Sequence, residues 1–161
     1  MRCDKTRMQI PETVGRLEQY LGPWASEPMR LRTAITSIEK MDLEKHAAAY
    51  QPRGEIGAYT VRDDAAVISV TGAMTKYGSS LSDMPYGTVG VRKAIRNAAR
   101  DPKVNRIVMT FYSSGGTVDG TGDLADEVRR ASKQKPVTAY IEDLCASAAY
   151  WVASQADEVV S

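Results

Sequence analysis

The chain has 161 residues, of which 43% are hydrophobic and 25% are charged, and its formal net charge is +1. These values are typical of one globular domain, and the small net charge gives no general attraction to nucleic acid or to an anionic membrane. No apolar run is long enough to span a bilayer, and no signal-peptide pattern follows Met1. Two cysteines provide no disulfide framework, which fits a reducing cytoplasm.

Residues 1–60 are predicted to form a mainly helical lead segment. Apolar residues recur at helical spacing in residues 13–21 and again in residues 31–41, and Gly22-Pro23 separates the two stretches. Their apolar faces are expected to pack on the chain's own sheet or on a partner protein, because periodicity indicates a buried face but not what covers it.

Residues 61–161 are predicted to alternate strands and helices. Such alternation predicts an α/β core of parallel strands joined by right-handed crossovers. The expected strands are 66–70, 104–111 and 137–141, the expected helices are 89–99, 119–132 and 146–156, and residues 156–161 are typical of the start of another strand.

A glycine pair and a serine follow two neighbouring predicted strands. Gly115 and Gly116 lie in a Ser-Ser-Gly-Gly turn signal after one strand, and Ser147 lies among small residues after the next. The carboxyl ends of parallel strands meet at one sheet edge, where ligands bind. Glycine lets a backbone amide approach a substrate, and the first amides of a helix lack intrahelical partners. One amide of the glycine pair and the amide of Ala148 could therefore hold an oxyanion, although Ser147 taken alone is more typical of an ordinary N-cap.

These motifs resemble peptidase family S49, which includes signal peptide peptidase A and the phage head-maturation proteases of the minor capsid protein C type. The resemblance covers roughly residues 64–161, with matching segments at 67–72, 101–118 and 135–151. It implies the ClpP/crotonase fold, with Ser147 as the catalytic nucleophile and with oxyanion donors at Gly116, or Gly115, and at the amide of Ala148. Two departures are Ser114 in place of the family's turn proline and Ala148-Ala149 in place of two glycines.

The resemblance also implies partners and a location. A phage enzyme of this type would cleave capsid or scaffold protein, form a homo-oligomer, and act in the host cytoplasm or the procapsid. It implies no cofactor, no metal, and no nucleic-acid or membrane partner. The missing signal-peptide pattern favours the phage type, because signal peptide peptidases are usually membrane-anchored.

Members of the family use a Ser–Lys dyad in which the lysine lies several dozen residues after the serine. No Lys, His or Arg follows Ser147 in this chain, and a serine hydroxyl is a weak nucleophile without a base. We therefore expect the lysine to be missing from this chain, as in a C-terminally truncated piece of a longer protease. His46, in the lead segment, is expected to be a solvated residue. The earlier lysines that could serve instead are Lys76, Lys93, Lys103, Lys133 and Lys135.

Two other functions stay open on the sequence alone. Without a base, the same groove could bind an extended peptide as an added strand and serve assembly instead of cleavage. A crotonase-like acyl-CoA enzyme would share the fold and the paired amides, although no carboxylate follows Ser147 at the helix start. Cys145 is expected to be a small buried filler, not a nucleophile.

Overall fold

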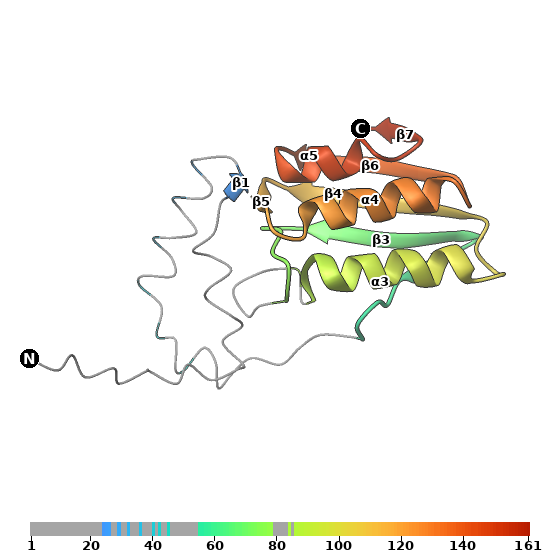
Figure 1. Ribbon diagram of the computed structural model, residues 1–161, viewed down its shortest axis with the longest axis horizontal. Coiled ribbons are helices and arrows are strands. Elements are labelled where there is room, and N and C mark those ends of the chain that lie inside the picture. The colour runs from blue at the N-terminus through green and yellow to red at the C-terminus, as the bar shows by residue number, and fades with distance from the viewer. Residues whose placement is uncertain are drawn as a thin grey trace, which may run out of the picture.

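The computed structural model describes residues 55–78, 84 and 86–161, together with residues 24–26 and six single positions between 29 and 45. Within them, one sheet has five strands in the order β2-β3-β4-β6-β7, and β1 pairs with β5 in a second sheet (Figure 1). The strands are β1 (Trp24–Ser26), β2 (Thr60–Arg62), β3 (Ala65–Thr71), β4 (Arg106–Ser113), β5 (Gly115–Thr117), β6 (Val137–Cys145) and β7 (Glu158–Val160). The helices are α3 (Gly87–Arg100), α4 (Thr121–Ser132) and α5 (Ala148–Ala153).

Four strands of the larger sheet run parallel. β3, β4, β6 and β7 pair in that order, and β2 is antiparallel to β3. The helices α3, α4 and α5 connect successive parallel strands, as the sequence pattern predicts. Each connection moves to the next strand in the same direction, so right-handed crossovers place the three helices on one face of the sheet.

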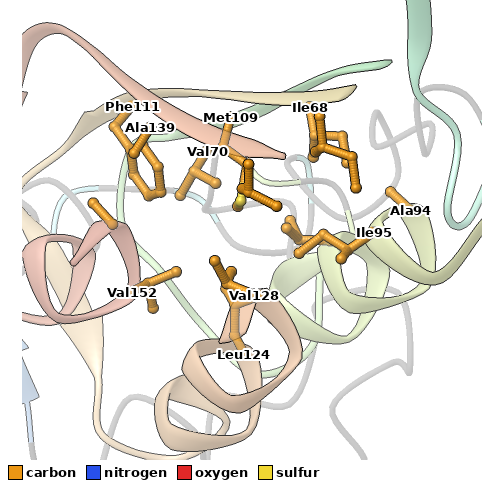
Figure 2. Close-up of a cluster of buried hydrophobic side chains, with 14 of the residues drawn as sticks. Ile68, Val70, Ala94, Ile95, Met109, Phe111, Leu124, Val128, Ala139 and Val152 are labelled. Atoms are coloured by element: carbon orange, nitrogen blue, oxygen red, sulfur yellow. The ribbon is translucent and has the colours of Figure 1, made fainter. Parts of the chain in front are cut away.

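The hydrophobic core lies between that face and the helices. Side chains of β3 and β4 alternate between buried and more exposed positions, as in a sheet covered on one face. Figure 2 shows strand side chains pointing toward helix side chains, and burial of each large one contributes about 1.5–3 kcal/mol. The labelled residues from strands are Ile68, Val70, Met109, Phe111 and Ala139, and those from helices are Ala94, Ile95, Leu124, Val128 and Val152.

The predicted elements exist, but several of their ends were predicted wrongly. β4 begins at Arg106, two residues after the expected start. The reason is that Val104 belongs to a turn, in which its amide donates to the Asp101 carbonyl at 3.1 Å. α4 begins after Gly120, whose φ of 82° is left-handed and cannot continue a helix. β6 continues past residue 141 to Cys145, and α5 ends at Ala153.

Most of the expected helical lead segment lies outside the described residues, so the division between residues 60 and 61 stays a prediction. Within this segment the structure describes β1, a strand that the sequence pattern did not predict. The expected strand near the end of the chain is confirmed as β7, paired with β6. No helix in the described part of the chain is both long and apolar enough to cross a membrane.

Candidate active site

The carboxyl ends of β3, β4 and β6 lie together and carry the predicted site. The Gly72 amide, just after β3, donates to the Tyr112 carbonyl at 2.8 Å, and the Ala146 amide, just after β6, donates to the Ser113 carbonyl at 3.0 Å. A register shift between Phe111 and Ser113 precedes the last paired position of β4 and β6. These bonds fix the three loops against one another at the edge where parallel sheets bind ligands.

Ser147 occupies a strained turn between β6 and α5. Its φ of 53° and ψ of −120° make it one of two described non-glycine residues with positive φ. L-residues other than glycine avoid this conformation, and strained positions of this kind cluster at functional sites. A serine on a sharp strand-to-helix turn projects its hydroxyl from the sheet, and Ser147 is indeed exposed.

Ser147 takes the N-cap position of α5, but not the usual capping role of a serine. Its side chain makes no capping hydrogen bond to α5, whereas a capping serine accepts one from a first-turn amide. The helix is instead started by the Ser147 carbonyl, which accepts from the Trp151 amide at 3.0 Å. The hydroxyl is therefore left available for other chemistry.

The glycine pair forms a strand where a turn was expected. Gly115–Thr117 is β5, which pairs antiparallel with β1 on one side and forms a parallel bridge with Met74 on the other. The Met74 amide donates to the Gly115 carbonyl at 2.9 Å, and the Thr117 amide donates to the Met74 carbonyl at 2.8 Å. Pairing with β1 and Met74 thus holds in an extended conformation a Gly-Gly sequence whose local propensity favours a turn.

Gly115 lies directly against the turn at Ser147. A Cβ at this position would stand 3.1 Å from the Ala148 nitrogen and 3.1 Å from the Ala146 oxygen, and would collide with the Ala25 carbonyl oxygen. Its φ of 99° also favours glycine. The structure therefore brings together Gly115, the Ala148 amide and the turn at Ser147, as the sequence analysis expected.

The two glycine amides point in different directions. The Gly115 amide donates to the Ser113 hydroxyl at 3.2 Å. In β5 the Thr117 amide and the Gly115 carbonyl face Met74. Because backbone polar groups of successive residues in a strand point to opposite sides, the Gly116 amide faces the other side, where β1 lies. Of the two candidate oxyanion donors, Gly116 is the one that is not engaged by Ser113.

Ser113 was missed by the sequence analysis as a positioning residue. Its hydroxyl is buried, donates to the Gly72 carbonyl at 2.6 Å and accepts from the Gly115 amide, while its carbonyl accepts from Ala146. One residue therefore holds the loop after β3, the glycine pair and the start of the turn at Ser147. Its only sequence signal is its place as the first serine of the Ser-Ser-Gly-Gly motif.

Lys76 is engaged elsewhere. Its ammonium forms an ion pair with Asp119 at 3.0 Å and lies over the ring of Tyr77. The hydrogen bond to Asp119 and the charge of that carboxylate raise the pKa of Lys76, whereas a lysine base requires a lowered pKa.

The other candidate lysines show no link to the site. The Lys135 ammonium donates to the Ala98 and Asp101 carbonyls at 2.9 and 2.6 Å, next to the start of β4 and far from its carboxyl end. Lys93 packs against Gly57. Lys103 and Lys133 lie in the turns after α3 and α4, at the same end of the sheet as Lys135. His46 lies outside the described residues.

Cys145 is half-buried two residues before Ser147, and desolvation raises the pKa of its thiol to about 11. At neutral pH the thiol is therefore protonated and a poor nucleophile. The protonated thiol agrees with the expectation that Cys145 is not a nucleophile, although its burial is partial where a buried filler was expected. The described residues contain no group of three His, Cys, Asp or Glu side chains that could hold a metal ion.

Comparison with known proteins relates the chain to peptidases. The model of peptidase family S49 matches residues 129–161, which include the Ser147 turn. Capsid assembly protease C of Escherichia phage lambda is 34% identical over 103 residues, covering 62% of this chain and 23% of the relative. Head-tail preconnector protein GP5 of Enterobacteria phage P21 is 32% identical over 98 residues, covering 60% of this chain and 20% of the relative. The chain thus spans under a quarter of these relatives.

A solved structure relates the chain to a known fold. The crystal structure of an enoyl-CoA hydratase/isomerase family member shares 17% sequence identity and superposes with a TM-score of 0.51, covering 64% of this chain and 46% of that one. At this identity the likeness concerns the fold alone. It confirms the expected ClpP/crotonase-like α/β core.

Proposed function

Because this chain is related to peptidase family S49, we propose that it carries the nucleophile and the oxyanion hole of a serine endopeptidase. Ser147 attacks the carbonyl carbon of a substrate peptide bond. The amides of Ala148 and Gly116 donate to the oxygen of the tetrahedral intermediate. Loss of one such donor typically lowers the rate by two to three orders of magnitude.

The backbone at Ser147 is the observation that carries this proposal. Its φ of 53° is costly for a serine, its hydroxyl makes no capping bond, and the Ala148 amide stands beside Gly115, which lacks a Cβ. A turn with only a structural role would be better filled by glycine. The combination supports a hydroxyl held for chemistry.

We propose that the general base is a lysine of a longer polypeptide. It takes the Ser147 proton as the carbonyl is attacked and returns it to the amine that leaves, so that an acyl-enzyme forms and water then releases it. Two observations support this: the Lys76 ammonium is paired with Asp119, and the relatives are far longer than this chain.

The proposed substrate is a capsid or scaffold protein of a phage, cleaved by a homo-oligomer in the procapsid. The support is the likeness to a phage capsid assembly protease and to a phage head-tail preconnector protein.

The test is cleavage of co-expressed capsid and scaffold protein by the full-length gene product. Ser147→Ala is expected to abolish cleavage without lowering the melting temperature. Ser154→Ala is the matched control, because Ser154 is exposed just after the same helix, where its hydroxyl donates to the Trp151 carbonyl and accepts from the Gln155 side chain. Cleavage that survives Ser147→Ala would overturn the assignment.

A second candidate function is peptide binding without cleavage. The pairing of β1 with β5 supports it, because an edge of β5 already accepts an extended segment. Binding of scaffold peptide by a protein that never cleaves it would favour this function. The alternative function as an acyl-CoA enzyme is supported only by the shared fold. Acyl-CoA binding measured by calorimetry would favour it.

A further inference from the structure

Strand β1 lies at the edge of β5 beside the candidate nucleophile. Trp24, Ala25 and Ser26 pair antiparallel with Thr117, Gly116 and Gly115, in that order. Figure 1 shows β1 next to β5, although the two are far apart in the sequence. The other edge of β5 is occupied by the bridge to Met74. An extended peptide can therefore join β5 only where β1 now lies.

Ala25 holds the central place in this pairing. It lies opposite Gly116, whose amide faces β1. In an antiparallel pair of this kind, the backbone amide and carbonyl groups of the two opposed residues face each other. The Ala25 carbonyl oxygen occupies the space that a Gly115 Cβ would need, and the Ala148 nitrogen lies 3.1 Å from that same point. A carbonyl of the chain itself thus lies against Gly115, close to the Ala148 amide and in the strand segment paired with Gly116.

Ala25 fits the edge of β5 in size and polarity. Ala25 is partly buried and packs against the core, and the absence of a Cβ at Gly115 makes room for its carbonyl. Within the described residues β1 has three positions, so few ladder bonds hold it there and a longer extended peptide can replace it.

We propose that Trp24–Ser26 is a built-in competitor that fills the substrate-binding edge of β5, so that a substrate strand pairs there only after this segment leaves. The inference rests on the proposed function, because it assigns the same edge to substrate. It makes Trp24–Ser26 an autoinhibitory element.

The test is a binding assay that does not depend on cleavage. The full-length protein with Ser147→Ala is titrated with a fluorescent peptide of the sequence of residues 20–30. Adding Ala25→Pro removes the amide that faces Gly116, and it is expected to tighten peptide binding several-fold. Ser26→Pro is the matched control, because the Ser26 amide faces away from β5 and proline is tolerated there. It is expected to leave the affinity near that of the parent.

Equal affinity of all three proteins, or no binding by any of them, would overturn the proposal. A second measurement covers the case in which Ala25→Pro fails to fold: saturating peptide should speed hydrogen exchange at the Ala25 amide of the Ser147→Ala protein. Unchanged protection of that amide would also overturn the proposal. Failure of the proposed function appears separately, as cleavage that survives Ser147→Ala.

Discussion

The hydroxyl of Ser113 lies 3.2 Å from the amide nitrogen of Gly115 and accepts its hydrogen bond. The same hydroxyl donates to the Gly72 carbonyl, so a single oxygen links the loop after β3 to the glycine pair. Geometry at the candidate oxyanion hole therefore depends on a residue that performs no chemistry itself.

Ser113→Ala is expected to lower the free energy of unfolding by about 1–3 kcal/mol, because it leaves a buried amide and a carbonyl without their partner. Denaturant titration measures this loss. Ser154→Ala, at an exposed serine, is expected to stay within about 0.5 kcal/mol of the parent. Equal effects of the two substitutions would contradict the linking role of Ser113.

Gly115→Ala is expected to abolish Ser147-dependent cleavage and to destabilise the fold by about 1–3 kcal/mol, since the new Cβ meets the Ala25 carbonyl and φ is positive. The control is Gly122→Ala in the first turn of α4, where a Cβ meets only the Trp151 ring at 3.6 Å. That change is expected to be neutral or stabilising by up to about 1 kcal/mol. Peptide-cleavage rates and melting curves of both variants check the pair.

Glu127→Ala is expected to cost about 1.5–3 kcal/mol, because Glu127 is 6% exposed and its carboxylate accepts hydrogen bonds from arginines of α3 and α4. Arg96 donates to it at 2.7 Å and Arg130 at 3.4 Å. The neighbouring Asp126→Ala removes an exposed pair with Arg129 and is expected to cost less than about 1 kcal/mol. Denaturant midpoints that fall equally for both would show that the burial of Glu127 does not increase its contribution to the free energy of unfolding.

Tyr59 and Asp101 predict an acid-sensitive contribution to stability. The Tyr59 hydroxyl donates to the Asp101 carboxylate at 2.7 Å, and this bond, followed by that of the Lys103 amide, lowers the pKa of Asp101. A lowered folded-state pKa stabilises the protein above the ordinary aspartate pKa, and this stabilisation is lost as pH falls through the lowered value.

Urea midpoints of the parent and of Tyr59→Phe are therefore expected to differ most near neutral pH and to converge as pH falls from about 5 to about 2. A constant difference across that range would show that the hydroxyl acts through packing and not through the charge of Asp101.

Cys145 is expected to be slow to alkylate at neutral pH, because burial raises the pKa of its thiol to about 11. In the 161-residue chain Cys3→Ser leaves Cys145 as the remaining thiol, and its rate with iodoacetamide should rise steeply only in strong alkali. Cys145→Ala is expected to retain cleavage, whereas rapid alkylation that abolishes cleavage would move the nucleophile from Ser147 to Cys145.

The sequence predicted what depends on local pattern. Apolar runs and helical spacing located the core strands and helices, and the order strand, small residues, helix located the turn at Ser147. The link between Ser113 and Gly72 joins residues 41 positions apart, so no local signal announces it. β1 was missed for the same reason, since residues 24–26 become a strand only by pairing with β5.

The conformation of Ser147 has a consequence for how such a sequence can change over time. A serine held at a φ of 53° costs about 1–3 kcal/mol, a noticeable share of a typical folding free energy of about 5–15 kcal/mol. Glycine would remove that cost in one substitution. A lineage that no longer used the hydroxyl would drift toward glycine here. At this position folding stability therefore favours glycine, whereas use of the hydroxyl favours serine.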